Sequence, residues 1–531
     1  MGTPDFTSQA GLRHISGDHR EALHDSAATR QIEQLAAAAL PKHTLMARAG
    51  LAVARLARAL RPHAQCIWIA CGPGNNGGDG LVAASHLHRW AQASGGACRV
   101  VVTHAVRDDA RLPVDAQWAL QAARDAGVAF SDAPPAHVDL AIDALFGIGA
   151  IRPLEGPLAL WLRQLRASDA AVLSVDLPSG LDSDTGVLSP LADAVSATAG
   201  PRHTLSLLTL KPGLFTGMGR DAAGDVWFDD LSIAPAAFAA ASAWLSGPSI
   251  NGTGGPPRRP HAHHKGSYGD AVVIGGQGIA IDGAGMTGAA VLAARAALHM
   301  GAGRVFVGLL EGSTQNPVAW DPMSPELMFR RVERLLDDKV LGNASVVCGC
   351  GGGSAVAALL PAVLSTSRSL VLDADALNAI AADPTLQTML SQRRGRGLTT
   401  VLTPHPLEAA RLLATTTPAI MADRVRAAQD IADRFGSICV LKGSGTVLAT
   451  TGETPHINPS GNASLATAGT GDVLAGMIGG ALARPSHLPS QAFERVANAV
   501  HQHGALADQW DGGAAPGLSA SRLAARVTPL G

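Results

Sequence analysis

The sequence predicts an α/β protein made of two doubly wound domains, each built on a parallel sheet. Short apolar runs of strand length alternate with helical stretches in both halves of the 531-residue chain. A stretch rich in glycine, proline and serine, over residues 238–260, separates the halves and is typical of a linker. Because 47% of the residues are hydrophobic and 16% are charged, each half has ample material for a buried core.

Composition and charge favour small-molecule partners. The formal net charge is −2, which gives no electrostatic reason to expect nucleic acid or an anionic membrane as a partner. No window holds 18 uninterrupted apolar residues, and the first ten residues lack the basic and apolar regions of a signal peptide. The six cysteines form no C-x-x-C pair and no zinc spacing, so we expect reduced thiols. We therefore expect a cytoplasmic homo-oligomer that binds neither nucleic acid nor a membrane.

The first half begins with helical periodicity and then alternates strands with helices. Apolar residues recur at helical spacing over about 23–60, with a break at Pro41. The run C-I-W-I-A-C, residues 66–71, has the length and composition of a buried parallel strand. A glycine-rich turn over 72–80 follows it, and we expect a helix from Leu81. Further strands are predicted over about 98–103, 138–143 and 171–176.

Polar side chains lie at or just after the ends of three of these strands. Asn76 follows the first strand, Asp143 ends the third, Asp176 ends the fourth, and Ser179 follows the fourth. Ligands of doubly wound sheets bind at the carboxyl ends of the strands, so we expect these four residues to converge on one crevice. For each aspartate taken alone, the alternative is a helix N-cap.

Four motifs in this half are specific: G-P-G-N-N-G-G-D-G-L-V, D-A-L-F-G-I-G-A-I-R-P-L-E-G, S-V-D-L-P-S-G-L-D-S-D-T-G and T-L-K-P-G-L. They resemble the motifs of the NAD(P)H-hydrate epimerase domain, and the resemblance covers residues 13–237. It implies a Rossmann-like sheet and a potassium ion near Asn76, Asp143 and Ser179. Three oxygen-donating side chains suit such a hard cation.

The same resemblance implies a binding site for the hydrated nicotinamide nucleotide, NAD(P)HX. Asp176 is then also the catalytic carboxylate, because acid–base chemistry suits moving a hydroxyl between the two faces of C6 of the reduced ring. The implied contacts come from Asn75, Asn76, Gly77, Gly78, Asp79, Gly147, Ile148, Gly149, Ala150, Ile151, Arg152, Pro153 and Asp176.

The second half alternates strands and helices in the same way. Strands are predicted over 271–275, 305–309, 344–348, 370–373, 400–402 and 440–441, with a helix over 285–300. His405 lies between two prolines on a loop, a position more typical of a site than of a core. Lys442 opens the turn K-G-S-G-T at a strand end and is a candidate contact for a nucleotide phosphate. A lysine in solvent is the alternative.

Residues 458–476 carry the clearest catalytic pattern. Residues 469–471, G-T-G, form an unobstructed turn, and apolar residues recur at helical spacing from Val473, so a helix is predicted to begin near Asp472. Free N–H groups and the positive end of the helix dipole suit a polyphosphate. Asp472 would repel phosphate as a ligand, but it is well placed to take a proton from an attacking hydroxyl. The alternative is a packing turn in which Asp472 is only the N-cap.

Several pieces of this half are again specific: K-G-S-Y-G, L-D-A-D-A-L-N, T-P-H-P-L-E, L-K-G-S-G-T and N-P-S-G-N-A-S-L-A-T-A-G-T-G-D-V-L-A-G. Residues 261–531 resemble the ribokinase-like superfamily, and within it the nucleotide-dependent NAD(P)H-hydrate dehydratases. The resemblance implies an α/β/α sheet and ADP with Mg²⁺ as the phosphoryl donor, with ATP as the alternative. It implies nucleotide contacts from Lys442, Gly443, Ser444, Gly445, Thr446 and Gly471, and hydrate contacts from Ala289, Gly351, His405 and Asp472.

The chain departs from the pattern of these dehydratases at three positions. Leu407 lies where a glycine is common, Cys350 replaces a usual proline, and Ala468 precedes the G-T-G-D turn in place of glycine. Each is a small or loop residue, so we expect altered loop geometry with activity retained.

The function that these patterns predict is repair of hydrated nicotinamide nucleotides. The first domain would interconvert the R and S epimers of NAD(P)HX, and the second would dehydrate the S epimer to NAD(P)H at the expense of a nucleotide. Two alternatives are a vitamin or sugar kinase of ribokinase type fused to an accessory domain, and a first half that only binds a ligand or a protein.

Overall fold

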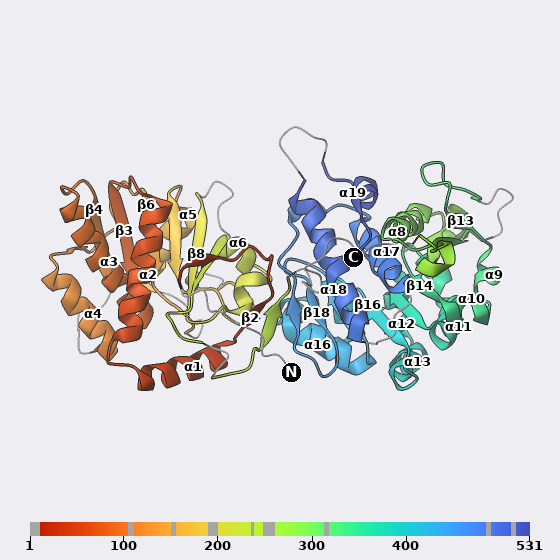
Figure 1. Cartoon of the computed structure of the whole chain (residues 1–531), viewed down its shortest axis with the longest axis horizontal. Helices are drawn as coiled ribbons and strands as arrows, with labels where there is room; N and C mark the ends of the chain where they lie inside the picture. Colours follow the sequence, from red (N-terminus) through yellow and green to blue (C-terminus); the bar gives the residue numbers. More distant parts are fainter. Residues whose placement is uncertain are drawn as a thin grey trace. The chain divides into compact units, whose positions relative to one another are not determined.

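The computed structural model of the chain divides into two compact units, Met1–Trp244 and Leu245–Gly531 (Figure 1). The structure describes residues 11–104, 111–149, 155–189, 200–234, 238–247, 261–312, 318–484, 490–510 and 517–530. Of the stretch expected to be a linker, residues 248–260 lie outside the described part. Among the described residues, no helix is long and apolar enough to cross a membrane.

The first unit is built on one sheet of eight strands. Neighbouring strands run parallel except at β1, which pairs antiparallel with β9. The order is β1 (Arg13–His14), β9 (Asp225–Asp229), β8 (Arg202–Leu207), β7 (Ala171–Val175), β6 (Leu140–Ala144), β3 (Cys66–Cys71), β4 (Arg99–His104) and β5 (Ala129–Ser131). The unit also contains β2 (Glu21–Leu23), and β10 (Ala243–Leu245) crosses the boundary between the units.

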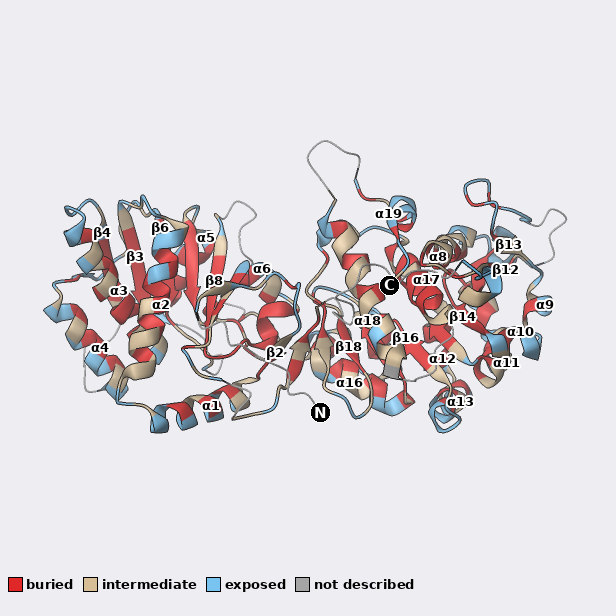
Figure 2. Ribbon diagram, in the orientation of Figure 1, coloured by how far each residue is buried: buried red, intermediate tan, exposed pale blue. Residues whose placement is uncertain are grey.

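Helices cover both faces of this sheet because its strands are apolar on both sides. In β3, Ile67 and Ile69 pack into the core beneath α2, α3 and α4, whereas Trp68 and Ala70 pack into the core beneath α5. In Figure 2 the strands are buried and the outer sides of the helices are exposed. The helices are α1 (Ser26–Ala39), α2 (Thr44–Leu60), α3 (Asn75–Ala93), α4 (Val114–Asp125), α5 (Gly156–Ala167) and α6 (Gly219–Ala223).

The chain leaves β3 and β6 toward opposite faces of the sheet, so a topological switch point lies between these two strands. The prediction of a helix from Leu81 was wrong at its start, since α3 begins at Asn75. The motif N-N-G-G-D is therefore the first turn of the helix. Glycine is needed there because a Cβ at Gly77 would lie 2.0 Å from the carbonyl oxygen of Gly72. Because glycine has a low helix propensity, the sequence did not predict this first turn as helical.

The second unit repeats this architecture on a second sheet. Its strands run in the order β13 (Met328–Phe329), β12 (Arg304–Leu310), β11 (Asp270–Gln277), β14 (Ala344–Cys348), β15 (Ser369–Leu372), β16 (Thr399–Leu402), β17 (Ile438–Leu441), β18 (Val447–Ala449) and β19 (His456–Ile457). All pairs from β13 to β17 are parallel, and β18 and β19 add antiparallel hairpins. The prediction of two doubly wound α/β domains is thus confirmed.

Two layers of helices enclose this second sheet (Figure 1). On one face lie α8 (Thr287–His299), α17 (Thr470–Ala483), α18 (Ser490–Asp508) and α19 (Ala520–Arg526), which pack on residues such as Val273 and Val307. The other face, which includes Val272 and Ile274, is covered by α9 (Val332–Leu335), α10 (Asp338–Asn343), α11 (Leu360–Thr366), α12 (Asp375–Ala382), α13 (Pro384–Gly395), α14 (Pro406–Leu412), α15 (Thr417–Ala422) and α16 (Arg424–Phe435). A short helix, α7 (Ile279–Asp282), follows β11.

Replacing Gly476 by alanine tests the close packing of α17 against α8. A Cβ at this position would lie 2.0 Å from the carbonyl oxygen of Ala293, so the two helices would have to move apart. We expect Gly476→Ala to lower the free energy of unfolding of the second unit by about 1–3 kcal/mol, as measured by urea unfolding. The matched control is Gly288→Ala on α8, where a Cβ meets nothing within 4 Å. Alanine there should be neutral or stabilising, and equal midpoints for the two variants would contradict the packing argument.

Candidate active sites

The first unit holds a cavity of about 590 Å³ at the carboxyl edge of its sheet. The walls come from α1, the turn before α2, the first turn of α3, and the loops that follow β6, β7 and β8. Of the site residues predicted from the sequence, those that line the cavity are Asn75, Asn76, Asp79, Gly147, Ile148, Gly149 and Asp176. Gly77 and Gly78 are buried behind it, and Ala150, Ile151, Arg152 and Pro153 lie outside the described residues.

Asn76 and Asp176 meet at Gly147 on the wall of this cavity. A Cβ at Gly147 would lie 3.3 Å from Asn76 Oδ1 and 3.4 Å from Asp176 Oδ2, so the two side chains flank this glycine. The amide Nδ2 of Asn76 is buried and has no hydrogen-bond partner among the described residues. The loops after β3, β6 and β7 thus present an amide and a carboxylate to one small volume.

Asp143 and Ser179 form a buried pair next to the same wall. The Ser179 hydroxyl donates to Asp143 Oδ1 at 2.6 Å, and the Ser179 backbone N–H donates to Asp143 Oδ2 at 2.9 Å. The hydroxyl also accepts from the backbone N–H of Phe146, a residue that lines the cavity, at 3.0 Å. Burial raises the pKa of Asp143, although the hydrogen bonds from Ser179 oppose the rise. This carboxylate therefore lacks a cation close enough to offset its burial fully.

Carboxyl groups concentrate around the cavity. Burial raises the pKa of Asp79 well above its ordinary value, and the charges of Asp176, Glu33 and Asp115 raise it further. Burial also raises the pKa of Glu33, with Asp176 as the next cause. The cavity thus holds carboxyls of different acidity, an arrangement that supports proton transfer.

Two cavity residues were missed by the sequence reasoning. Glu33 lies on α1 in a helical stretch that read only as packing material. Lys211 is fully buried, and its ammonium donates to Asp176 Oδ1. A lysine that directly follows the apolar run L-S-L-L-T-L was an available signal, because a lysine is rarely buried without a partner.

In the second unit, the loops after β11 and β14 meet at the switch point between these strands. Gly276 N–H donates to the carbonyl of Cys350 at 2.9 Å, and Gln277 N–H donates to the carbonyl of Gly351 at 2.6 Å. Gly351 has a left-handed backbone with φ of 56°, and a Cβ on it would lie 2.8 Å from the Cβ of Ala289. Two residues predicted to contact the same ligand, Ala289 and Gly351, are therefore neighbours.

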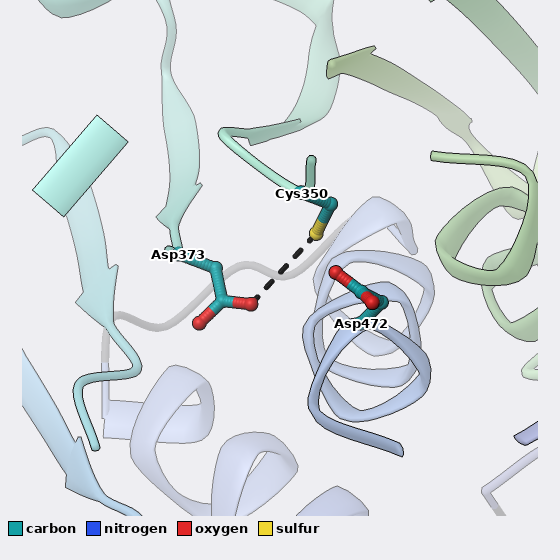
Figure 3. Close-up of side chains that lie close together, drawn as sticks. All are labelled: Cys350, Asp373 and Asp472. Atoms are coloured by element: carbon teal, nitrogen blue, oxygen red, sulfur yellow. Dashed lines mark hydrogen bonds between the residues drawn. The ribbon is translucent and has the colours of Figure 1, made fainter. Parts of the chain in front are cut away.

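Asp472 lies beside Asp373 and Cys350 at the carboxyl edge of this sheet (Figure 3). One ligand atom from each of the three side chains lies within 4.8 Å of the others, and the Cys350 thiol donates to Asp373 Oδ2 at 3.9 Å. Burial, followed by the charge of Asp373, raises the pKa of Asp472 to about 6. A carboxylate with this pKa is ionised at neutral pH and still basic enough to accept a proton.

Lys442 joins this group through an ion pair with Asp373. Its Nζ donates to Asp373 Oδ1 at 2.6 Å, and the Thr403 hydroxyl donates to the same oxygen at 2.7 Å. Burial acts to lower the pKa of Lys442, but the charges of Asp373 and Glu408 outweigh it and raise this pKa above its usual value. A Cβ at Gly471 would lie only 3.4 Å from Nζ, so the ammonium also faces the G-T-G-D turn.

The helix that carries Asp472 begins at Thr470, with Gly469 at the N-cap and φ of 89°. No side chain caps this helix, so Asp472, in its first turn, is not the N-cap. His503 from α18 stabilises the turn, because its Nε2 donates to the carbonyl of Thr470 at 2.9 Å. Burial lowers the pKa of His503 to about 4, so this ring is neutral. The backbone N–H groups at the start of α17 remain available for an anion.

His405 is the N-cap of α14 and also borders the site. Its Nδ1 accepts from the backbone N–H groups of Leu407 and Glu408, and the Glu408 carboxylate accepts from the His405 backbone N–H at 2.8 Å. This reciprocal capping holds the imidazole in place. Burial, followed by the charge of Lys442, lowers the pKa of His405. Burial raises the pKa of Glu408 to about 7. The other ring nitrogen, Nε2, lies 3.3 Å from Glu408 Oε1, so Glu408 holds the ring from both sides.

The turn of residues 442–446 is held from behind by Arg424, a residue that sequence reasoning missed. Arg424 is 1% exposed, and its guanidinium donates to the carbonyls of Leu441, Lys442 and Gly445 at 3.2–3.4 Å. A Cβ at Gly443 would lie 2.8 Å from Arg424 Nη1. Side chains and backbone groups of this turn are thereby fixed beside the start of α17.

Two family models match the chain. The model described as NAD(P)H-hydrate dehydratase matches residues 271–529, and the model described as YjeF-related protein N-terminus matches residues 42–213. The chain is 34% identical over 484 residues to the Bifunctional NAD(P)H-hydrate repair enzyme Nnr of Escherichia coli (strain K12), with 88% of this chain and 85% of the relative covered. That similarity extends over both units.

Further relatives match the second unit. The chain is 40% identical over 273 residues to the ADP-dependent (S)-NAD(P)H-hydrate dehydratase of Neisseria meningitidis serogroup B, with 51% of this chain and 86% of the relative covered. Among solved structures, it is similar to the ADP/ATP-dependent NAD(P)H-hydrate dehydratase from Bacillus subtilis co-crystallised with ATP/Mg²⁺. The identity is 29%, the TM-score is 0.39, and 51% of this chain and 91% of that chain are covered.

Burial of four of the six thiols predicts a pattern of alkylation. Cys71, Cys348, Cys350 and Cys439 are buried, and burial raises the pKa of each thiol above its ordinary value. We expect iodoacetamide at pH 8 to label only the two half-buried cysteines, at 66 and 98, in the native protein, because the thiolate is the reactive form. Peptide mass spectrometry measures the labelling, with the urea-denatured chain as the control in which all six react. Native labelling of Cys350 at the rate of Cys98 would contradict the burial.

Proposed function

Since this chain belongs to the bifunctional NAD(P)H-hydrate repair enzymes, we propose that its first unit epimerises NAD(P)HX through Asp176 and that its second dehydrates the S epimer through Asp472. The enzyme is an isomerase and a nucleotide-dependent lyase. The observation that carries the assignment of Asp472 is its position in the first turn of α17, beside Asp373 and Cys350. Burial, which raises its pKa to about 6, supports the same role.

In the dehydratase reaction, Asp472 accepts the proton of the C6 hydroxyl. The hydroxyl oxygen then attacks the terminal phosphorus of the nucleotide, a new P–O bond forms, and the bond from that phosphorus to the bridging oxygen breaks, so that the nucleotide leaves with one phosphate fewer. Hydroxide is a poor leaving group. Phosphate leaves C6 of the ester readily, because the lone pair of the ring nitrogen assists cleavage of the C–O bond. Loss of a proton from C5 then restores the reduced ring. The nucleotide loses one phosphate, and the sum of the steps is dehydration.

The nucleotide would bind where the turn of residues 442–446 meets the start of α17. Free backbone N–H groups at that helix end and the Lys442 ammonium supply positive charge for the phosphates. The relative named as an ADP-dependent dehydratase supports ADP as the donor, with ATP as the alternative.

Mg²⁺ would accompany the nucleotide and neutralise charge on its phosphates. The carboxylate of Asp373 fits such a hard cation, whereas the Cys350 thiol does not, and Lys442 already neutralises one oxygen of Asp373. The residues therefore fit a metal held mainly by the phosphates and by the Asp373 carboxylate, with Asp472 left as the base.

The hydrate would bind in the second unit against Ala289, Gly351 and His405. Ala289 and Gly351 lie against each other, so together they present a small, flat surface to a planar ring. Because only one C6 epimer fits a site built around a single carboxylate, the epimerase on the same chain allows both epimers to be repaired.

In the epimerase unit, Asp176 would exchange protons with the C6 hydroxyl and water. The C–O bond breaks with help from the ring nitrogen, water leaves, and water returns to the opposite face. A potassium ion fits the oxygen atoms of Asn76, Asp143 and Ser179, since all three are hard donors and the burial of Asp143 calls for a cation. Such an ion would order the loops around Gly147.

We further propose a cytoplasmic location. Six free cysteines suit a reducing compartment. A homo-oligomer is also proposed, on the strength of the family resemblance.

Incubation with mixed NADHX epimers tests the whole proposal. With ADP or ATP, absorbance at the NADH wavelength should rise until both epimers are consumed, and with no nucleotide only interconversion of the epimers should be seen by chromatography. Accumulation of a stable phosphorylated product without NADH would instead indicate a small-molecule kinase.

Asp472→Asn should lower the single-turnover rate of dehydration by roughly 10²- to 10⁴-fold, because the amide cannot accept the proton. Nucleotide affinity, measured by titration calorimetry, should hold, since removal of a negative charge beside a polyphosphate does not weaken binding. Lys442→Ala should instead raise the nucleotide dissociation constant. The matched control is Asp338→Asn, in the first turn of α10, which should leave both quantities unchanged. Near-normal turnover in Asp472→Asn would contradict this mechanism.

The pH dependence of dehydration follows from the same carboxylate. A base with a pKa of about 6 is ionised above pH 6 and protonated below it. We therefore expect the single-turnover rate at saturating ligands to be flat above about pH 7 and to fall about tenfold per pH unit below pH 6. In Asp472→Asn this acidic limb should disappear. A wild-type rate that is constant from pH 5 to 8 would argue against Asp472 as the base.

Asp143→Ala should separate the two activities. The variant lacks the only carboxylate of the proposed potassium site, so epimerisation and its stimulation by KCl should both fall. Dehydration of the purified S epimer, in the other unit, should continue at the wild-type rate. Equal loss of both activities in a chain that remains folded by circular dichroism would contradict the assignment of separate sites.

A further inference from the structure

Lys211 has an environment that is rare for lysine. The residue is 0% exposed, and it follows the loop after β8 at the inner end of the epimerase cavity. Its ammonium donates to the carboxylate of Asp176, to the carbonyl of Leu207 at 2.8 Å and to the carbonyl of Thr209 at 2.9 Å. The Ser206 hydroxyl lies at 3.4 Å. Three N–H groups thus meet at least three acceptors, and no proton of the ammonium is left for a substrate.

Asp176 is held in a strained conformation at the same place. Its φ is 66°, in the left-handed region that residues other than glycine rarely adopt. Oδ1 is fully engaged, because it accepts from the Lys211 ammonium and from the backbone N–H of Leu207 at 3.1 Å. Oδ2 is the oxygen that points to Gly147 and the cavity, 3.4 Å from where a Cβ of that glycine would lie. The lysine therefore selects which oxygen of Asp176 faces a substrate.

The charge of Lys211 also acts on the carboxyl groups around this cavity. Glu33, Asp79, Asp115 and Asp176 lie around this cavity, and burial, followed by the charges of the other three, raises the pKa of Asp79. The Lys211 ammonium opposes this repulsion at Glu33. Without it, Asp176 would be a fourth carboxyl among three others, free to rotate and with no fixed cation beside it.

We propose that Lys211 is a positioning residue of the epimerase: it holds Asp176 through Oδ1, so that Oδ2 meets the C6 hydroxyl of the hydrate. This inference rests on the proposed function of the first unit. Lys211 acts through Asp176 and takes no proton itself. It also keeps the loop of Leu207 and Thr209 wrapped around the ammonium, which orders the inner wall of the cavity.

The test is Lys211→Met, which keeps the length and apolar volume of the side chain but removes its charge and its hydrogen bonds. We expect the kcat of epimerisation to fall roughly 10- to 100-fold, because the reacting carboxylate is no longer fixed. The KM for NADHX and the KCl concentration for half-maximal activity should stay within about twofold, since Lys211 donates to Asp176, Ser206, Leu207 and Thr209, whereas Asp143 and Ser179 bind each other. Dehydration by the same chain should be unchanged.

Two further variants separate positioning from mere support of the fold. Arg202→Met removes another cation of the first unit that binds backbone carbonyls, those of Gly200, Arg166 and Ser168, at a place away from the cavity. Per folded molecule, this variant should retain the wild-type kcat even if its melting temperature falls. In Lys211→Ala, ethylammonium chloride should restore kcat saturably, whereas propanol of similar size should not.

Two outcomes would show that Lys211 is not a positioning residue. A wild-type kcat in Lys211→Met, or equal rescue of Lys211→Ala by propanol and ethylammonium, would overturn the positioning role. If Lys211→Met does not fold, Lys211→Gln, which keeps an N–H donor, takes its place and should show the same fall in kcat at constant KM. Absence of epimerisation in the wild-type chain would refute the proposed function of the unit and not this inference alone.

Discussion

The close approach of two backbone segments at the edge of each sheet is the constraint on which both sites depend. A Cβ at Gly72 would lie 1.8 Å from the carbonyl oxygen of Leu145, and a Cβ at Gly275 would lie 2.4 Å from the carbonyl oxygen of Cys350. Only glycine allows such contacts without displacing a strand. In each unit, the contact joins the carboxyl ends of two neighbouring strands where their connections diverge to opposite faces. The backbone by itself therefore forms the crevice at this switch point, and the polar side chains line it.

Each crevice then places a lysine against an aspartate. In the first unit the pair is Lys211–Asp176, and in the second it is Lys442–Asp373. A buried ion pair offsets its own desolvation only when further hydrogen bonds satisfy both partners, and both pairs meet this condition through carbonyls or the Thr403 hydroxyl. The consequence differs between the units. The first pair includes the proposed catalytic carboxylate, whereas the second lies beside Asp472 and, with burial, sets its pKa.

Much of the fold could be predicted because its central strands are apolar on both faces. The runs around β3, β11 and β14 are mostly apolar, and their predicted bounds came within a few residues of those observed. The strands β8 and β9 were missed, since residues such as Thr204 and Ser206 break their apolar runs. The start of α3 was misplaced because its first turn is rich in glycine, which is retained there for close packing rather than for helix propensity.

The sequence by itself determined the two domains, the residues at the strand ends, and, through its motifs, the chemistry expected of each half. It did so because periodicity and glycine-rich turns are local properties of the chain. Only the tertiary structure decided how those residues meet: that Lys211 pairs with Asp176, that Asp373 and Cys350 adjoin Asp472, and that Arg424 binds the turn of residues 442–446. The reason is physical. Charge states and hydrogen bonds depend on burial and on partners that are distant in sequence. Neither burial nor such partners can be deduced from one segment of the chain.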